Sequence, residues 1–494
     1  MECGSKSSAL LLTAMALLTL AGCNAANTAL NSPNNPTPTP APAPTSAPNE
    51  WVWVSGANIA NQAGSYGTLG ITTAGNVPGA RAGAASWTDA QGNLWLFGGA
   101  GPMVGGGCNQ FDPLCWAGTN SYYNDLWKFN GSEWTWMGGS NTTDQPGSYG
   151  TQGVAAAGNA PGARLSAVNW RDAAGNLWFF GGTGYDSAGN VGYLNDLWEY
   201  SGGAWTWVGG AKVINQGGTY GTQGTAAPGN FPGARADAVG LTDASGNFWL
   251  FGGQGCADFC GAYMNDLWEF SGGQWTWVSG FSVFYPTQPG VYGTQGTPAP
   301  GNVPGGRSNA SGWLDSSGNF WVFGGVGWGS WDGNVAELND VWRFSKDQWT
   351  WVSGPDESYA NIDQLGTYGT QGTAAPGSTP GSRDSGMSWT DAQGNLWLFG
   401  GEGFSSVYAG TSPYQNDLWK YNNGQWTWMD GSNVGARTGI YGFLGIPAAG
   451  NNPGGRVGAA SWIDASGNLW LFGGFGGDST GNQGDLNDLW EYQP

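Results

Sequence analysis

The sequence of 494 residues contains no histidine. This absence excludes catalysis by a Ser-His-Asp triad or a Cys-His pair, and it excludes any metal site with an imidazole ligand. Charged residues are scarce, at 10% of the chain, and 14 basic residues stand against 34 acidic ones. Since nucleic acid is bound through a basic face, the net charge of −20 argues against a nucleic-acid-binding protein.

The apolar run near the N-terminus, residues 9–20, is too short to cross a bilayer as a helix. It leads into Leu20-Ala21-Gly22-Cys23, which resembles the lipoprotein box of bacteria. We therefore expect a lipoprotein signal peptide over residues 1–22 and a lipid on Cys23 that anchors the exported protein in the cell envelope. Asn24, directly after the lipidated cysteine, favours anchoring in the outer membrane. An ordinary signal peptide that ends near a cysteine is the alternative.

Residues 23–49 form a second segment without a periodic apolar pattern. Proline stands at every second position from Pro36 to Pro44. Such a segment favours the extended polyproline II conformation. We interpret it as a tether between the lipid anchor and a folded domain over residues 50–494.

Glycine and tryptophan are abundant, with 92 and 32 residues, and aromatic residues make up 14% of the chain. The glycines do not follow the three-residue period of collagen. Many glycines beside many aromatic residues indicate numerous turns that join short, well-packed strands. The composition therefore favours an all-β repeat protein.

One pattern recurs six times between residues 50 and 494. An arginine precedes a predicted strand; an apolar strand ending in a glycine pair follows; then comes an Asn-Asp pair with Leu or Val and Trp after it. The six arginines are Arg81, Arg164, Arg235, Arg307, Arg383 and Arg456. The six aspartates of the Asn-Asp pairs are Asp125, Asp196, Asp266, Asp340, Asp417 and Asp488.

Each repeat thus predicts four strands, which we name a to d: strand a begins at the arginine, b ends at the glycine pair, c begins at Asn-Asp, and d contains a Trp-x-Trp segment. The sixth repeat lacks strand d, and a Trp-x-Trp segment stands instead at Trp51–Trp53. This offset predicts a six-bladed β-propeller of four-stranded blades, closed by the N-terminal strand pairing with the last blade. Linear stacking in a solenoid is the alternative.

These motifs resemble the kelch-repeat family, in which a glycine pair ends strand b and aromatic residues recur in strands c and d. The resemblance covers residues 51–494 and implies a propeller fold. The repeats are longer than the usual kelch repeat because each has an insertion between strands d and a, with a Tyr-Gly-Thr-Gln/Leu-Gly segment. Such sequences are also described as galactose oxidase-like, but that enzyme holds copper partly through histidine. The resemblance implies the fold and not that chemistry.

The loops between strands b and c differ in every repeat, and loops on a rigid scaffold commonly carry binding sites. Their aromatic and acidic residues are our candidate ligand-binding residues: Phe111, Trp116, Tyr122, Tyr123, Trp328, Trp331, Asp332, Glu402, Phe404, Tyr408 and Tyr414. They predict non-catalytic recognition of a polysaccharide or of an envelope protein. Packing of these loops on one another is the alternative.

Two other functions remain open. A carbohydrate-active enzyme of the sialic-acid mutarotase type, found among six-bladed kelch proteins, would need an acid or base such as Glu402, Asp332 or Asp478. A scaffold without a tight ligand is the third possibility. We predict no cofactor, no metal and no nucleic-acid partner.

The repeated arginines and aspartates are expected to pair with each other as structural groups rather than to bind an anion. Four of the six cysteines form two near pairs, Cys108 with Cys115 and Cys256 with Cys260, each within one b–c loop. Two local disulfides are the expected state of an exported protein. A zinc site shared by the two loops is the alternative.

Overall fold

The computed structural model describes residues 49–102, 121–256, 260–282, 288–330, 335–356, 364–407 and 413–494. Throughout these residues the fold is all-β, with strands joined by turns and loops and no helix. Accordingly, the described residues include no helix that could cross a membrane. The expectation of an all-β repeat fold is confirmed.

Six antiparallel sheets repeat the same strand order. In the second repeat, β9 (Val168–Arg171), β10 (Leu177–Phe180), β13 (Leu197–Ser201) and β14 (Ala204–Gly209) pair in chain order. These correspond to the predicted strands a to d. The matching strands of the first repeat are β2 (Ala85–Thr88), β3 (Leu94–Phe97), β6 (Leu126–Phe129) and β7 (Trp134–Gly138). Those of the third are β16 (Val239–Thr242), β17 (Phe248–Phe251), β20 (Leu267–Ser271) and β21 (Gln274–Ser279).

The fourth and fifth repeats follow the same plan, with one extra short strand in the fourth sheet. The fourth contains β23 (Ser311–Leu314), β24 (Phe320–Gly327), β25 (Ala336–Ser345) and β26 (Gln348–Ser353). The fifth contains β28 (Met387–Thr390), β29 (Leu396–Phe399), β31 (Leu418–Asn422) and β32 (Gln425–Asp430).

The sixth sheet combines the two ends of the described chain. It contains β34 (Ala460–Ile463), β35 (Leu469–Phe472) and β38 (Leu489–Tyr492), and its outer strand is β1 (Trp51–Ser55). β1 runs antiparallel to β38, with Trp51 opposite Tyr492. The backbone N–H of Asn49 also donates to the carbonyl of Gln493 at 2.7 Å.

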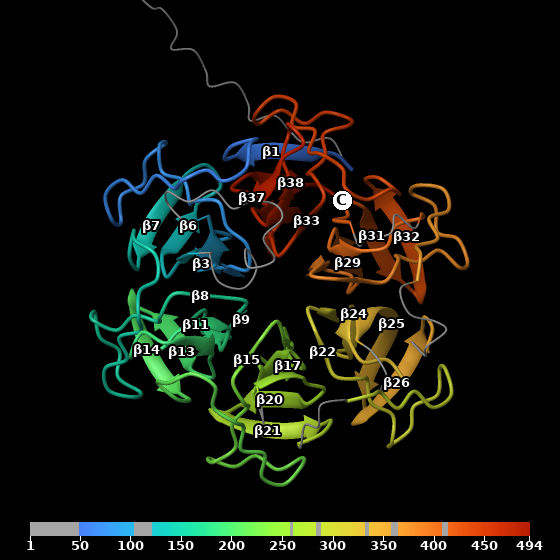
Figure 1. Ribbon diagram of the computed structural model, residues 1–494, viewed down its shortest axis with the longest axis horizontal. Coiled ribbons are helices and arrows are strands. Elements are labelled where there is room, and N and C mark those ends of the chain that lie inside the picture. The colour runs from blue at the N-terminus through green and yellow to red at the C-terminus, as the bar shows by residue number, and fades with distance from the viewer. Residues whose placement is uncertain are drawn as a thin grey trace, which may run out of the picture. The chain divides into compact units, whose positions relative to one another are not determined.

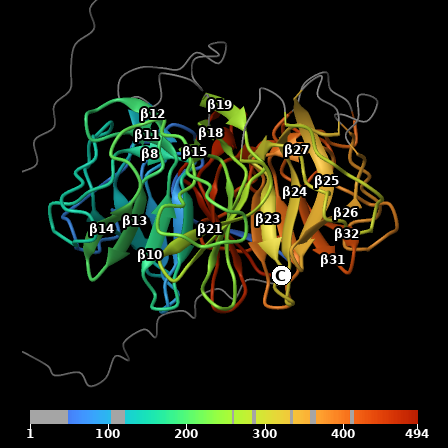
Figure 2. The ribbon, with the colours of Figure 1, turned by 90° about the horizontal axis from the view of Figure 1, so that it is seen from below.

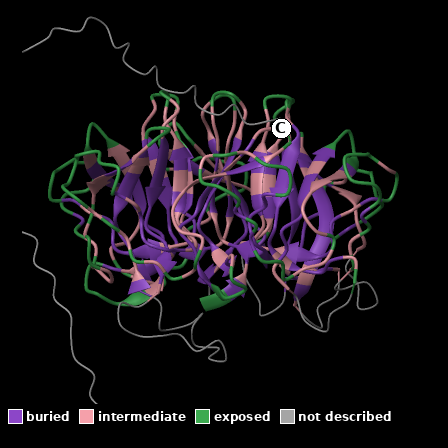
Figure 3. Ribbon diagram, turned by 90° about the horizontal axis from the view of Figure 1, so that it is seen from above, coloured by how far each residue is buried: buried purple, intermediate pink, exposed green. Residues whose placement is uncertain are grey.

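Within this part of the chain, the first strands of the sheets lie side by side around a common centre (Figure 1). β2 neighbours β9, and the series continues through β16, β23, β28 and β34 back to β2. The hydrophobic core lies between neighbouring sheets; for example, Trp127 of the first repeat packs in one cluster with Trp462 of the sixth. Figure 3 shows the buried residues concentrated in the sheets and the exposed ones in loops and turns.

Strand b was predicted to end at the glycine pair, but the chain pairs again beyond it. In the second repeat, Gly181 and Gly182 have φ values of 69° and 96°, which bend the backbone and which glycine adopts without strain. A short ladder follows, in which β8 (Arg164–Leu165) pairs with β11 (Thr183–Tyr185), and β11 pairs with β12 (Val191–Tyr193). The sequence shows no alternation of apolar and polar residues in this ladder, because its strands are short and rich in glycine and polar residues. The ladder was therefore not predicted.

Comparable ladders occur in the other repeats, at the end of the sheets that carries the b–c loops (Figure 2). In the described residues they comprise β4 (Ala100–Gly101) with β5 (Ser121–Tyr122); β15 (Arg235–Ala236), β18 (Gln254–Cys256) and β19 (Cys260–Tyr263); β22 (Arg307–Ser308) with β24; β27 (Arg383–Asp384) with β30 (Glu402–Gly403); and β33 (Arg456–Val457), β36 (Phe475–Gly477) and β37 (Gln483–Asp485). These ladders carry residues of the candidate site.

Candidate functional site

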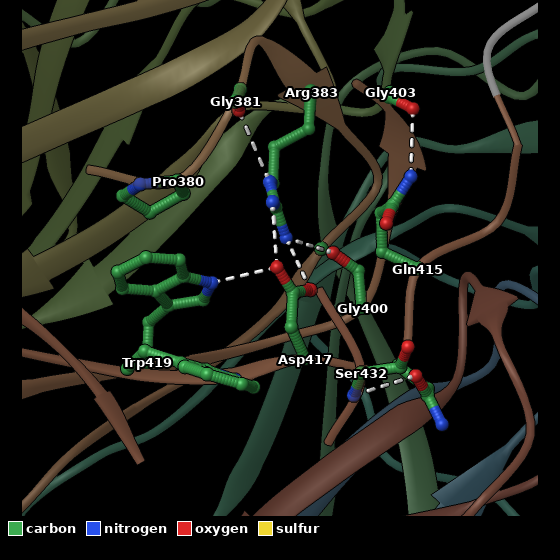
Figure 4. Close-up of polar contacts among 12 residues, drawn as sticks. Pro380, Gly381, Arg383, Gly400, Gly403, Gln415, Asp417, Trp419 and Ser432 are labelled. Atoms are coloured by element: carbon green, nitrogen blue, oxygen red, sulfur yellow. Dashed lines mark hydrogen bonds and ion pairs between the residues drawn. The ribbon is translucent and has the colours of Figure 1, made fainter. Parts of the chain in front are cut away.

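Each repeated arginine lies against the aspartate of its own repeat. In the fifth repeat, Nη1 and Nη2 of Arg383 donate to the two carboxylate oxygens of Asp417 at 2.7 and 2.9 Å (Figure 4). Both side chains are buried. The other five pairs, Arg81–Asp125, Arg164–Asp196, Arg235–Asp266, Arg307–Asp340 and Arg456–Asp488, have shortest N–O distances of 2.6 to 2.7 Å.

Two further donors complete the hydrogen bonding of each aspartate. The Tyr368 hydroxyl and the Trp419 indole N–H both donate to Asp417, each at 2.6 Å. Nε and Nη1 of Arg383 also donate to the carbonyls of Gly381 and Gly400, respectively. We call such a set of Arg, Asp, Tyr and Trp a frame quartet. Its charges and donors are satisfied inside the protein, so it is a structural group.

The tyrosine of the quartet comes from the Tyr-Gly-Thr segment between strands d and a. All six copies of this tyrosine make the same bond: Tyr66, Tyr149, Tyr220, Tyr292, Tyr368 and Tyr441 each donate to the aspartate of the sheet on which their loop packs. The sequence revealed the repeated tyrosine but not its partner, which lies 46 to 59 residues further along the chain.

The described loop aromatics do not form an exposed surface. Tyr123 is buried against the guanidinium of Arg81, with the Cζ atom 4.1 Å from the ring centre. Trp328 and Phe404 are also buried, with 9% and 5% of their surface exposed. These three candidate residues are therefore buried rather than presented on the surface.

Tyr122 and Tyr414 are half-buried and pack edge-on against an aromatic ring of the next repeat, Tyr185 and Phe475 respectively. Glu402 is half-buried in β30. Other predicted residues lie outside the described residues: Cys23, Cys108, Cys115, Phe111, Trp116, Trp331, Asp332 and Tyr408.

The predicted disulfide between Cys256 and Cys260 is confirmed. It links the ends of β18 and β19 at the tip of the third b–c hairpin. The disulfide therefore fixes the shape of this hairpin.

Asp478, one of the acids considered for catalysis, holds a turn. Its carboxylate accepts hydrogen bonds from the backbone N–H groups of Ala60, Thr480 and Asn482 and from the Thr480 hydroxyl. Burial alone would raise the pKa of Asp478, but these hydrogen bonds outweigh it and lower the pKa. A carboxylate stabilised in this way is a poor proton donor.

A different set of residues breaks the symmetry of the ladders. Asp384 follows the repeated arginine of the fifth repeat, where the other repeats have Ala82, Leu165, Ala236, Ser308 and Val457. Directly across the ladder from Asp384 stands Glu402. The equivalent position on the returning strand is a tyrosine in four repeats and an acid in two: Tyr122, Tyr193, Tyr263, Glu337, Tyr414 and Asp485. Sequence reasoning missed Asp384, Tyr193 and Tyr263, which become visible only when the repeats are aligned position by position.

The carboxyl groups of this region influence one another. Burial, together with the nearby charges of Glu402 and Asp237, raises the pKa of Asp384 to about 7, although the Ser385 hydroxyl acts in the opposite sense. Burial and the charge of Glu337 raise the pKa of Glu402 to about 7. Burial also raises the pKa of Asp237. We call Asp237, Asp384 and Glu402 the central carboxyl cluster.

The two tyrosines belong to the same environment. Burial and the charges of Asp384 and Asp237 raise the pKa of Tyr263. Burial and the charge of Asp237 raise that of Tyr193, whose hydroxyl is 3.2 Å from Oε1 of Gln254. Within the described part of the chain, no basic side chain lowers the pKa of any member of the cluster. The cluster is an uncompensated acidic site beside phenol groups.

Asp237 also belongs to a cyclic series of backbone hydrogen bonds. The residue two positions after each repeated arginine has a positive φ, and its N–H donates to the carbonyl of the equivalent residue in the preceding repeat. The series closes with the bond from Gly83 to Gly458, at 2.7 Å. We call these residues the collar: Gly83, Ser166, Asp237, Asn309, Ser385 and Gly458.

A cavity of about 550 Å³ is lined by the six first strands and by collar residues. Asp237, Asn309 and Ser385 of the collar contribute to its wall. Asp237 therefore connects the cavity with the central carboxyl cluster. Among the described residues, no group of three or more acidic or cysteine side chains is arranged to hold a metal ion.

No protein-family model and no curated protein matches the sequence. Among solved structures, the chain is similar to that of YjhT, at 14% identity and a TM-score of 0.46, over 84% of this chain and 95% of that one. It is also similar to a fungal alcohol oxidase of the AA5 family in complex with copper, at 11% identity and a TM-score of 0.42, over 88% of this chain and 77% of that one. Both TM-scores are below 0.5, so function must be inferred from this chain's own residues.

Proposed function

We propose that the chain is a six-bladed kelch-type propeller, closed by β1, that is exported and anchored to the cell envelope by a lipid on Cys23. The pairing of β1 with β38 and the cyclic hydrogen bonds of the collar support closure. Deleting residues 50–55 removes the outer strand of the last sheet and is expected to lower Tm sharply. Deleting six tether residues, 36–41, is the control; equal Tm values for the two deletions would contradict closure.

The function proposed for this propeller is carbohydrate binding at the central carboxyl cluster. The observation that carries it is an uncompensated, asymmetric set of carboxyl groups beside Tyr193 and Tyr263. Carboxylates accept hydrogen bonds from sugar hydroxyls, and phenol rings pack against the apolar face of a sugar. The ladder of the sixth repeat adds Phe475 and, directly across from it, Asp485, whose pKa is raised to about 7 by burial.

A polysaccharide suits this site better than a protein partner. Tyr123, Trp328 and Phe404 are buried and give no aromatic anchor for a protein interface. The cluster instead combines the ladder residues Asp384 and Glu402 with Asp237 of the collar, and a single sugar residue needs only a few such convergent polar groups.

A glycan and polysaccharide array tests the proposal with the purified protein and two variants, Asp384→Asn and Glu402→Gln. Wild-type protein should bind a defined glycan, and each variant should weaken binding about tenfold, the effect of losing a hydrogen bond to a charged group. Glu269→Gln is the matched control, because Glu269 is also half-buried with a raised pKa but lies on β20. Absence of glycan binding, with an envelope protein captured by crosslinking, would favour the protein partner.

Acid–base catalysis on a sugar is a second candidate, favoured by one observation. Asp384 and Glu402 are cross-strand partners, and both have a pKa of about 7. Near neutral pH such a pair supplies one protonated and one ionised carboxyl group, as general acid and general base. Opening and closing the ring of a reducing sugar needs only such proton transfers, which is the chemistry of a mutarotase.

The interconversion of sugar anomers, followed by NMR, tests the catalytic candidate. Wild-type protein should accelerate the exchange with a bell-shaped pH dependence, and either Asp384→Asn or Glu402→Gln should remove the acceleration while the sugar still binds. Exchange at the rate of the buffer alone, with binding intact, would leave recognition as the function.

A further inference from the structure

Among the described residues, the loop between strands d and a that precedes the sixth repeat exposes four large apolar side chains, and the equivalent loop of the first repeat exposes three, Ile59, Leu69 and Ile71. The loop before the sixth repeat covers residues 431–455 and follows β32. Ile440, Phe443, Leu444 and Ile446 have 58%, 81%, 55% and 47% of their surface exposed. We call these four residues the apolar loop tip.

The equivalent loops of the other repeats provide internal controls. Threonine occupies the position of Phe443 in all five of them, and glutamine occupies that of Leu444 in four. These glutamines, such as Gln152 and Gln223, donate a hydrogen bond to a carbonyl at the end of the adjacent strand d. The propeller therefore accommodates a polar residue at the positions of Phe443 and Leu444, and Phe443, at 81%, is the most exposed of the large apolar side chains in the described residues.

The apolar loop tip lies beside the strand at which the chain enters the propeller. The N–H of Gly445 donates to the carbonyl of Trp53 in β1 at 2.7 Å, and the amide of Asn451 donates to that of Trp51. Asn49 precedes β1, and the predicted lipidated residue, Cys23, stands 26 residues before it. The chain thus enters the propeller at β1, the outer strand of the sheet on which the exposed loop packs.

The charge of this loop also differs from that of the whole chain. Residues 431–455 contain one basic residue, Arg437, and no acidic residue, whereas the chain carries a net charge of −20. Arg437 is exposed. Anionic headgroups would repel most of the protein surface but not this segment.

We propose that the apolar loop tip contacts the lipid bilayer in which the Cys23 anchor is inserted. Phe443 and Leu444 enter the interfacial region, and Arg437 meets the anionic headgroups. The contact fixes which edge of the propeller faces the membrane. The proposal uses the predicted anchor only to bring the loop close to a membrane. Binding of the loop to lipid can be tested in a chain that lacks the anchor.

Flotation with vesicles of phosphatidylethanolamine and phosphatidylglycerol tests this contact. The full chain with Cys23→Ser carries no lipid and should still float with the vesicles. Adding Phe443→Thr and Leu444→Gln, the residues found in the other loops, should reduce vesicle binding about tenfold or more. Tm should stay unchanged, because the introduced glutamine can donate the same hydrogen bond that Gln152 donates in the second repeat.

The matched control is Val154→Thr, which removes an exposed apolar side chain, 51% exposed, from the equivalent loop of the second repeat. It should leave flotation unchanged. Two results would overturn the proposal: no flotation of the Cys23→Ser chain, or equal flotation of the chain with and without the loop substitutions. If the substitutions instead dissociate a dimer in sedimentation, the occupant of the tip is a second copy of the chain, and the membrane contact is also refuted.

Discussion

The frame quartets and the central carboxyl cluster both contain carboxyl groups, in neighbouring parts of the same repeats. The quartet carboxylates are paired with an arginine, and, in the residues that the structure describes, the cluster carboxyl groups are not. Asp417 accepts hydrogen bonds from Arg383, Tyr368 and Trp419, and the set recurs in every repeat. Asp384, the residue after Arg383, has a hydroxyl partner in Ser385 and faces other acids. The carboxylate repeated in every blade is satisfied by the fold, whereas Asp384, which is not repeated, has no basic partner among the described residues.

The cost of each arrangement explains the difference. A buried carboxylate is tolerated when an arginine and additional donors replace its lost hydration. The central cluster has no such compensation, and its members respond by holding protons at higher pH. Groups that destabilise the fold are retained where they serve binding or catalysis.

The largest expected effect comes from breaking one quartet. In Asp266→Ala, Arg235 remains buried without its counter-ion, and the hydroxyl of Tyr220 and the indole of Trp268 lose their acceptor. We expect the free energy of unfolding to fall by about 3–5 kcal/mol. Urea denaturation monitored by tryptophan fluorescence measures this change.

Asp384→Asn, in the central cluster, is the matched control for Asp266→Ala and should not destabilise the protein. A loss below about 1 kcal/mol in Asp266→Ala, the range of an exposed ion pair, would show that the quartets do not hold the frame.

Sequence periodicity predicted the frame well because each repeat shows the same spacing. Arg81 and Asp125 recur with their neighbours six times, so their pairing could be inferred without coordinates. The tyrosine of the quartet could not be assigned, since Tyr220 meets Asp266 through the path of a long loop rather than through a local spacing. Local patterns do not encode such contacts.

The candidate site was harder to predict for the same reason. Aromatic residues in variable loops predicted ligand binding, but Trp328 and Phe404 are buried. Burial depends on how closely a loop packs, which composition does not specify. Asp384 and Glu402 meet only because a short ladder forms beyond the glycine pair, where no strand was predicted.

A smaller effect tests how much the loop tyrosine adds to a quartet. Tyr368→Phe removes the hydroxyl that donates to Asp417 at 2.6 Å but keeps the ring against Trp419. We expect a loss of about 1.5–3 kcal/mol, the range for a hydrogen bond to a charged group. The same substitution at the ladder tyrosine of the second repeat, Tyr193→Phe, should cost less. Equal losses would mean that the quartet tyrosine acts only through its ring.

The smallest expected effect on stability comes from removing the charges of the central cluster. Unlike the other substitutions, this one should stabilise the protein. Asp384 and Glu402 have folded pKa values of about 7 against ordinary values of 3.8 and 4.5, so the folded state binds more protons between these limits. Their favourable contribution is complete below pH 4 and is lost as the pH rises through 7. The double variant Asp384→Asn/Glu402→Gln cannot ionise and should be more stable than wild type at pH 8, on the order of 1 kcal/mol after allowing for partial exposure.

Urea denaturation of the double variant and the wild type at pH 8 and pH 4 separates this electrostatic effect from repacking. The two proteins should differ at pH 8 and converge at pH 4, where the wild-type carboxyl groups are protonated. A difference of the same size at both pH values would indicate altered packing instead. If the variant that is more stable at pH 8 also loses glycan binding, the comparison with Asp266 is complete: one carboxylate is needed for the fold, and the other two weaken the fold at the site they serve.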